Sequence, residues 1–352
     1  MVIAHRGASG HRPEHTGEAY RLALRMGADA VEPDVVPSRD GVLVVRHENE
    51  LSTTTDVADH AELAGRRTTK HIDGVLVEGW FTEDLTWQEL TTLRARERIP
   101  ALRPENTRFD GRWPLLRLAE VIRLVQDEAS SAPAHVVVEL KHPTFFREAG
   151  LPLEELLEHE LDVAGVDASP DWLTVESFEK SALSAVAGRG LRSRRVYLAE
   201  PPGTAFDLVT RDGSAAVAYA DELSASGIRR LGGLSVPGPD GQPQPHLHGV
   251  SVAKPMLLDD PTSGRRLVEQ AHNAGLTVWS FTLRPENWFL ADRHRDGPDA
   301  ALGRWRDEFA EMIATGVDGV FADHPDLVRT LYLPDGAPCG ILASDQREDD
   351  GA

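Results

Sequence analysis

The chain has 352 residues, of which 41% are hydrophobic, so it is long enough for one large α/β barrel or for two ordinary domains. The formal net charge of -20 at pH 7 argues against nucleic acid or an anionic membrane as a general partner. The sequence holds no apolar run of about 18 residues or more, so we expect no membrane span.

The cysteine content and the printed start bear on the compartment. The chain has one cysteine, Cys339, so it cannot form an intramolecular disulfide and gives no sign of an oxidising environment. Only Met1 to Ala4 precede the first polar motif, and no signal peptide is visible. We therefore expect a cytoplasmic protein. A leader upstream of the printed start would instead make it a secreted one.

Short apolar runs that end in polar residues alternate with helical patterns along most of the chain. The runs predict strands at residues 2–5, 30–36, 42–46, 135–140, 172–177, 195–199, 249–253, 276–281 and 317–322. Apolar residues three and four positions apart predict helices at 14–26, 115–128, 152–164, 178–187, 215–226, 262–274 and 304–315. This alternation predicts a parallel sheet, and eight such strands favour a (β/α)8 TIM barrel, with 42–46 as an extra hairpin strand.

Three regions interrupt this alternation. Residues 56–114 are predicted to be an insertion after the second βα unit, with a short helix near 87–96. Residues 232–249 are rich in glycine and proline and are predicted to be a loop. We expect a single barrel domain over residues 1–333, followed by a disordered tail at 334–352.

Acidic residues lie near the ends of two predicted strands. Glu32 and Asp34 are two positions apart in one strand, so their side chains point to the same face. Glu139 lies near the end of the next barrel strand, and Lys141 follows it two positions later. Functional residues of a (β/α)8 barrel lie at the carboxyl ends of its strands. These three acids are therefore a candidate oxygen-ligand set for Ca²⁺ or Mg²⁺.

Two histidines and two basic residues accompany these acids. His5 ends the first strand and His47 follows the hairpin strand, and a histidine can give or take a proton near neutral pH. We interpret the two histidines as a proton-transfer pair. Arg6 and Lys141 would neutralise a phosphate group, which the negative protein as a whole repels. This set of residues indicates metal-assisted cleavage of a phosphodiester.

The motifs resemble those of the glycerophosphodiester phosphodiesterases over residues 2 to about 330. The matching segments include His5-Arg6-Gly7, Pro13-Glu14-His15-Thr16, Glu32-Pro33-Asp34, Arg46-His47, Val138-Glu139-Leu140-Lys141, Ser177-Phe178 and Ala322-Asp323-His324-Pro325. Their spacing is similar to that of the longer bacterial form of the family, which carries an insertion. The resemblance implies a (β/α)8 barrel with a divalent metal on the three acids, acid–base catalysis by the two histidines, and phosphate contacts from Arg6 and Lys141.

The chain departs from the family pattern at two positions. His15 stands where the family usually has asparagine, and Glu48 stands where it usually has aspartate. A second Pro-Glu-Asn-Thr at 104–107 and a Pro-Glu-Asn at 285–287 lack a preceding His-Arg-Gly, so we interpret them as chance matches.

The predicted substrate is a small glycerophosphodiester, which would yield sn-glycerol 3-phosphate and an alcohol. The attacking oxygen is either the glycerol 2-hydroxyl, through a cyclic intermediate, or a water molecule. Phe178 and Trp279 are candidates to pack on the glycerol carbons, although barrel packing explains them equally well. Asp318 and Asp323 are interpreted as turn and capping residues. The sequence does not assign the role of each histidine, the head group, the preferred metal or the oligomeric state.

Three alternative functions make different demands on the sequence. An amidohydrolase-type metal barrel requires a His-x-His pair at the end of the first strand, and this chain has His5-Arg6-Gly7 there. A related barrel phospholipase acting on sphingomyelin or lysophospholipids would share the site but needs an apolar entrance. The insertion contains aromatic residues that would suit one: Trp80, Phe81, Trp87, Phe109 and Trp113. A non-catalytic binding barrel would be expected to lack a ligand or a histidine, and none is lost.

Overall fold

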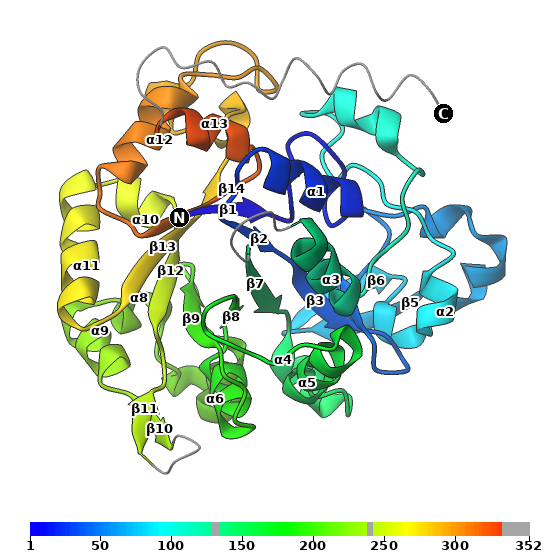
Figure 1. Cartoon of the computed structure of the whole chain (residues 1–352), viewed down its shortest axis with the longest axis horizontal. Helices are drawn as coiled ribbons and strands as arrows, with labels where there is room; N and C mark the ends of the chain where they lie inside the picture. Colours follow the sequence, from blue (N-terminus) through cyan, green and yellow to red (C-terminus); the bar gives the residue numbers. More distant parts are fainter. Residues whose placement is uncertain (129–133, 238–241, 333–352) are drawn as a thin grey trace.

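The computed structural model describes residues 1–128, 134–237 and 242–332. Within these ranges eight parallel strands close into a barrel surrounded by helices (Figure 1). The barrel strands are β1 (Val2–His5), β2 (Ala30–Glu32), β7 (His135–Leu140), β8 (Leu173–Ser177), β9 (Arg194–Ala199), β12 (Gly249–Ala253), β13 (Thr277–Leu283) and β14 (Gly319–Ala322). Each strand pairs with the next in this order, and β14 pairs with β1 to close the ring. The predicted (β/α)8 barrel is therefore confirmed.

The second predicted strand is interrupted by proline. Pro33 separates β2 from β3 (Asp34–Pro37), because proline has no N–H to donate to a neighbouring strand. Its carbonyl oxygen still accepts a hydrogen bond of 3.0 Å from the Glu139 amide, so pairing with β7 continues across the break. Strand β4 (Leu43–Val45) then pairs antiparallel with β3, which confirms the predicted hairpin strand.

Most outer helices lie where the hydrophobic spacing predicts them. They include α1 (Gly17–Arg25), α3 (Leu118–Glu128), α5 (Leu153–Ala164), α6 (Lys180–Gly188), α11 (Pro261–Asn273) and α12 (Trp305–Ile313). Thr16 caps the start of α1 by accepting a hydrogen bond of 3.2 Å from the Ala19 amide. Shorter helices lie between or after them: α4 (Pro143–Glu148), α10 (Pro255–Leu258) and α13 (Pro325–Thr330).

The predicted helix at 215–226 is wrong. The chain forms α7 (Phe206–Asp212) before it and then two separate helices, α8 (Tyr219–Glu222) and α9 (Ala225–Gly232). Ser224 causes the break, because its hydroxyl caps α9 by accepting a hydrogen bond from the Gly227 amide. The loop predicted at 232–249 contains a short hairpin of β10 (Ser235–Pro237) and β11 (Pro243–Pro245), and residues 238–241 and the tail at 334–352 lie outside the described residues.

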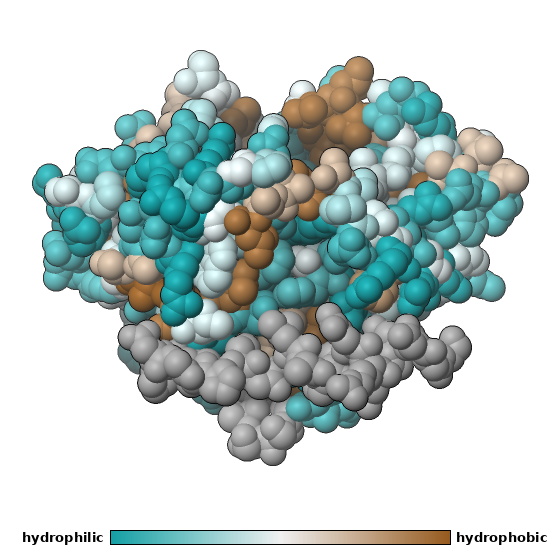
Figure 2. Space-filling model, turned by 90° about the horizontal axis from the view of Figure 1, so that it is seen from above, coloured by the Kyte–Doolittle hydropathy of each residue, from teal (hydrophilic) through white to brown (hydrophobic). Residues whose placement is uncertain are grey.

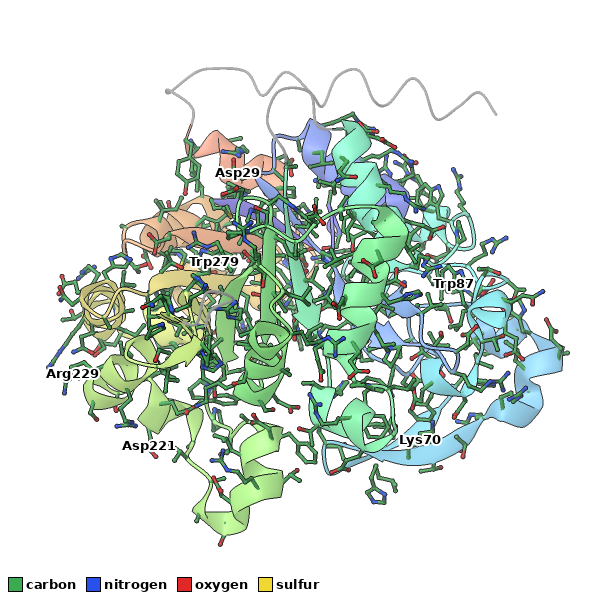
Figure 3. The ribbon with its side chains drawn as sticks, turned by 60° about the horizontal axis from the view of Figure 1, so that its bottom comes forward. Asp29, Lys70, Trp87, Asp221, Arg229 and Trp279 are labelled. Atoms are coloured by element: carbon green, nitrogen blue, oxygen red, sulfur yellow. The ribbon has the colours of Figure 1, made fainter. Side chains whose placement is uncertain are left out.

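The insertion at 56–114 lies beside the barrel. It contains a hairpin of β5 (Thr68–Ile72) and β6 (Val75–Gly79), the short helix α2 (Trp87–Leu90), and a 3-10 helix at Pro104–Phe109. The helix predicted near 87–96 is shorter than expected and ends at Leu90. Lys70 and Trp87 lie at one side of the molecule, away from Trp279 inside the barrel (Figure 3).

The inward-facing side chains of the barrel form two successive layers. One layer is a buried apolar cluster of Ile3, Ala30, Val137, Val196, Trp279 and Phe321. Side chains two positions further along a strand point to the same face. The next layer, towards the carboxyl ends, therefore includes His5, Glu32, Glu139 and Phe281. This layer forms the floor of the site, above the apolar layer.

The outer surface agrees with the high charge of the chain. The face shown in Figure 2 is largely hydrophilic, with separate hydrophobic areas. Among the described helices, none is long and apolar enough to cross a membrane.

Candidate active site

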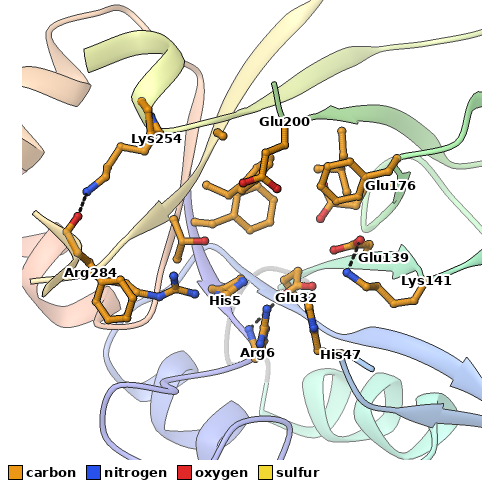
Figure 4. A pocket seen from close by; sticks show the side chains of 18 residues that line it. His5, Arg6, Glu32, His47, Glu139, Lys141, Glu176, Glu200, Lys254 and Arg284 are labelled. Carbon is orange, nitrogen blue, oxygen red and sulfur yellow. Dashed lines mark hydrogen bonds and ion pairs between the residues drawn. The ribbon is translucent and has the colours of Figure 1, made fainter. Parts of the chain in front are cut away.

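A cavity of about 410 Å³ lies at the carboxyl ends of the barrel strands. Seven of the nine residues that the sequence nominates line it: His5, Arg6, Glu32, His47, Glu139, Lys141 and Phe178 (Figure 4). They come from β1, the β2–β4 region, β7 and the segment after β8, so only closure of the barrel brings them together. Asp34 and Trp279 do not line the cavity, although an oxygen of Asp34 lies within 4.8 Å of oxygens of Glu32 and Glu139, which do.

Three buried carboxylates form the acidic part of the site. Glu32, Asp34 and Glu139 each offer an oxygen atom, and these atoms all lie within 4.8 Å of one another. Burial and the neighbouring Asp34 raise the pKa of Glu32 well above its usual value. Burial likewise raises the pKa of Glu139 to about 8. The cluster is short of positive charge, which a divalent cation would supply.

Asp34 is held in place by three neighbours. Its Oδ2 lies 3.0 Å from His15 Nε2 and 3.2 Å from Arg6 Nε, while its Oδ1 lies 3.8 Å from Lys141 Nζ. Burial alone would raise the pKa of Asp34, but Lys141, His47 and Arg6 hold it well below its usual value. Asp34 Oδ1 is buried and has no hydrogen-bond partner among the described residues.

His15, which replaces the asparagine usual in the family, therefore braces a candidate metal ligand. It is completely buried and also lies 2.8 Å from the Tyr20 hydroxyl through its Nδ1. The two ring nitrogens connect α1 to the acidic cluster.

His5 is bonded to an aspartate that lies 318 residues away in the chain. Its Nδ1 lies 2.6 Å from Asp323 Oδ1. Burial would raise the pKa of Asp323, but Arg284, Arg103 and His5 hold it well below its usual value. An ionised carboxylate only accepts, so Nδ1 of His5 carries the proton and Nε2 is left as the proton acceptor. Burial, followed by Arg6, lowers the pKa of His5 to about 4.

His47 is oriented in the same way by the residue that follows it. Its Nδ1 donates to Glu48 Oε1. Burial would raise the pKa of Glu48, but His47 and Arg98 hold it well below its usual value. Burial, followed by Arg6 and Lys141, lowers the pKa of His47 to about 3. Both histidines are thus neutral at pH 7 in the free protein.

The two predicted phosphate-binding residues are engaged with carboxylates. Arg6 Nη1 lies 3.1 Å from Glu14, and Lys141 Nζ lies 2.8 Å from Glu139 Oε1. Arg284 adds a third positive group at the cavity, where its Nε donates to Asp323 over 2.8 Å. The sequence interpretation did not single out Arg284, because it follows β13 in a region without a recognised motif.

The two predicted aromatic residues have different positions. Phe178 lines the cavity and lies 5.9 Å from Phe281, measured between ring centroids. Trp279 is buried in the core layer below, where it packs edge-to-face on Phe321. Phe281 occupies the place at the cavity that the sequence interpretation gave to Trp279. The alternation of side chains along a strand could have indicated this, because Phe281 is two residues after Trp279, points to the same face, and lies closer to the carboxyl end of β13.

Other functional candidates were missed or misread. Glu176 on β8 lies opposite Glu139 in the strand register, lines the cavity, and has a buried Oε2 without a hydrogen-bond partner among the described residues. The interpretation of Asp323 as a turn or capping residue is wrong, since its carboxylate bonds His5. The motifs at 104–107 and 285–287, which were interpreted as chance matches, also supply residues that form buried hydrogen bonds. Asn106 Nδ2 donates to Glu97, and Glu286 accepts from Arg103, all in buried positions.

The chain is similar in sequence to known proteins of one family. Residues 5–327 match the model of the Glycerophosphoryl diester phosphodiesterase family. The Arabidopsis thaliana glycerophosphodiester phosphodiesterase GDPD6 is 30% identical over 91% of this chain and 82% of its own length. A glycerophosphodiester phosphodiesterase of Haemophilus influenzae is 28% identical, but the match covers only 51% of that protein.

Solved structures show the same fold. A putative glycerophosphoryl diester phosphodiesterase from Silicibacter pomeroyi superimposes with a TM-score of 0.62 at 20% identity, over 94% of this chain and 92% of that one. A phosphodiesterase from Oleispira antarctica in complex with the product sn-glycerol-3-phosphate gives a TM-score of 0.58 at 19% identity, over 94% and 96% of the two chains. From the family match over residues 5–327, the chain belongs to the glycerophosphoryl diester phosphodiesterase family and is an enzyme of that class.

Proposed function

We propose that this enzyme hydrolyses glycerophosphodiesters to sn-glycerol 3-phosphate and an alcohol, with a divalent cation on Glu32, Asp34 and Glu139 and with His5 and His47 as the proton-transfer pair. One observation carries the proposal. Glu32, Glu139 and both histidines line a single cavity that also contains Arg6, Lys141 and Arg284, and an oxygen of Asp34 lies within 4.8 Å of oxygens of the other two acids. The sn-glycerol-3-phosphate in the Oleispira antarctica relative supports the same product class.

The acidic residues fit a divalent cation. Ca²⁺ and Mg²⁺ prefer oxygen ligands, and the three carboxylates converge within 4.8 Å. Asp34 Oδ1 is left without a hydrogen bond in a buried position, as expected of an atom kept for a metal. A bound cation would offset the charge of the phosphate group and hold it for in-line displacement.

The two histidines suit the proton transfers. Each donates a hydrogen bond from Nδ1–H to an ionised carboxylate, so each keeps the tautomer in which Nε2 can accept a proton from an attacking hydroxyl or water. A bound phosphodiester anion raises the pKa of a histidine beside it, because it favours the charged form. The second histidine can then carry the proton that the leaving alcohol needs.

The phospholipase alternative gains no support from the insertion. Phe81 and Phe109 are buried within the insertion, and the Trp80 indole N–H donates to the Leu63 carbonyl. None of the five aromatic residues considered for an apolar entrance lines the cavity in the described part of the chain. Its apolar lining instead comes from residues such as Phe178 and Phe281, which suit a small glycerol group.

The test is release of sn-glycerol 3-phosphate from glycerophosphocholine, measured with a coupled dehydrogenase. We expect His5→Ala and His47→Ala each to lower kcat by about 10²- to 10⁴-fold with unchanged circular dichroism. His71→Ala is the matched control, because His71 is exposed on the β5 hairpin. EDTA should abolish activity, and Ca²⁺ or Mg²⁺ should restore it. Full activity in either histidine variant, or in EDTA, would contradict the assignment.

A further inference from the structure

One short segment of the insertion lies against the first βα loop. Residues 97–103 border a second cavity of about 160 Å³, which also contacts His5 and Arg6. Two arginines of this segment, Arg98 and Arg103, point towards the barrel and bond carboxylates there. No other part of the insertion supplies a basic group to either of the two cavities described here.

Arg98 holds the carboxylate that orients His47. Its Nη1 and Nη2 donate to the two oxygens of Glu48 over 2.9 Å and 2.7 Å. Its Nε and Nη2 donate to the two oxygens of Glu14 over 2.7 Å and 2.6 Å. Two-point bonding of this kind fixes the plane of a carboxylate as well as its charge. Glu48 is about one-third exposed, so without Arg98 it would be free to turn towards solvent.

Arg103 holds the carboxylate that orients His5. Its Nη2 donates to Asp323 Oδ2 over 2.7 Å, which leaves Oδ1 for His5. Its Nε donates to Glu286 over 2.6 Å, and its Nη1 donates to the Ser9 carbonyl over 3.0 Å. All three side chains of the Arg103, Asp323 and Glu286 cluster are buried. Each of the three guanidinium nitrogens of Arg103 has a partner, which favours one arrangement of this buried charge cluster.

We propose that Arg98 and Arg103 are positioning residues for the two catalytic histidines, acting through Glu48 and Asp323. The inference rests on the proposed roles of His5 and His47. Each arginine occupies a carboxylate oxygen, so that the carboxylate presents an oxygen to the histidine Nδ1 and keeps Nε2 free for proton transfer. Partners of this outer kind set the tautomer and the ring orientation. The insertion thereby adds two basic groups to the contacts that orient the histidines, beside Arg284, which follows β13 and also bonds Asp323.

A simple anchoring role for the insertion makes different predictions. An anchor would affect stability, and its removal would change activity only as far as the folded fraction falls. If the arginines are positioning residues, replacing one lowers kcat in protein that remains folded and leaves KM nearly unchanged. The same replacement has no further effect once the carboxylate between the arginine and the histidine has been removed.

The experiment uses the full chain with Arg98→Ala, Arg98→Lys, Arg103→Ala and Arg103→Lys. We expect a 10- to 100-fold loss of kcat for the alanine variants, with KM within about threefold and partial recovery in the lysine variants. Arg67→Ala is the matched control, since Arg67 lies in the same insertion and pairs with Glu78 on the exposed surface. It should retain kcat within about twofold.

Double-mutant cycles test whether each arginine acts through its carboxylate or affects activity independently of it. In a Glu48→Ala background, Arg98→Ala should cause little further loss, and the same should hold for Arg103→Ala in an Asp323→Ala background. Nitrogen-15 spectra of labelled histidine should show a single Nδ1–H tautomer for His47, replaced by a mixture in Arg98→Ala. Thermal unfolding shows which variants are folded. If Arg103→Ala does not fold, Arg103→Lys and the Arg98 variants still test the positioning role.

Unchanged kcat in folded Arg98 and Arg103 variants, or fold-changes that simply multiply in both cycles, would overturn this inference. Such a result would leave the proposed function standing if His5→Ala and His47→Ala remain inactive. Activity in the histidine variants would instead remove the proposed function itself, so the two failures are distinguishable.

Discussion

Nδ1 of His5 lies 2.6 Å from Oδ1 of Asp323, although the two residues are 318 positions apart in the chain. The contact forms because β14 pairs with β1 to close the barrel, with Ala4 opposite Ala322. His5, the last residue of β1, and Asp323, the residue after β14, are therefore neighbours. The residue that follows the last barrel strand thus orients a histidine of the first barrel strand.

This relationship predicts that Asp323→Asn slows the reaction. The variant loses the charge that fixes the Nδ1–H tautomer of His5, so we expect kcat to fall by about 10- to 100-fold with little change in KM. Asp318→Asn serves as the control, since Asp318 precedes β14 and bonds the Val278 amide away from the cavity. Equal effects of the two substitutions on kcat would contradict the role given to Asp323.

The two aromatic residues of β13 should separate substrate binding from stability. Phe281→Ala removes part of the cavity lining, so we expect KM to rise by about three- to tenfold. Trp279→Ala removes a buried core side chain, so we expect it to lower the free energy of unfolding by about 3–5 kcal/mol. Steady-state kinetics and urea denaturation of both variants check this, and the reverse pattern would contradict the assignment.

Metal binding should stabilise the protein as well as activate it. A cation present at 100 times its Kd raises the free energy of unfolding by about 2.7 kcal/mol, because it binds only the folded state. We therefore expect Ca²⁺ or Mg²⁺ to raise the Tm of EDTA-treated protein. Glu139→Gln removes one candidate ligand and should abolish most of this increase. An equal increase in the variant would show that the cation binds elsewhere.

Buried histidines make the protein sensitive to acid. Burial lowers the pKa of His135 to about 4, and its Nε2 lies 2.7 Å from the Thr174 hydroxyl at the opposite end of the barrel from the site. His135 is protonated below about pH 6.5 in the unfolded chain but only near pH 4 in the folded chain, so the free energy of unfolding decreases as the pH falls between these values. From pH 7 to pH 5 we expect a loss of about 2 kcal/mol from this group. His135→Gln should lack that part of the pH dependence in urea denaturation, and an unchanged slope would contradict it.

His15 should contribute more to stability than to chemistry. His15→Ala leaves the buried Tyr20 hydroxyl without this hydrogen-bond partner and removes one of two close partners of Asp34 Oδ2, the other being Arg6, so we expect it to lower the free energy of unfolding by about 1–3 kcal/mol. His15→Asn, which restores the residue usual in the family, should recover part of this loss. Chemical denaturation of both variants provides the measurement. Equal stability of wild type and His15→Ala would contradict the bracing role.

The acids and histidines at the cavity were predictable because they carry local signals. Glu32 and Asp34 are charged residues two positions apart in an apolar strand, and Glu139 interrupts another apolar strand. Such residues need a partner, and the spacing shows that they share a face. Asp323 carried no such signal, because an aspartate after a strand is also a common capping residue. Trp279 was misplaced because spacing along a strand does not show how deep in the barrel a residue lies.

The sequence by itself determined the candidate groups for the proposed chemistry at the strand ends and the alternation of strands and helices, because both depend on residues close together in the chain. Tertiary structure alone decided which distant groups support that chemistry. Asp323 reaches His5 only because the barrel closes, and Arg98 and Arg103 reach Glu48 and Asp323 only because the insertion lies against the first loop. The geometry of such charged contacts depends on long-range packing, and no local pattern of residues encodes it.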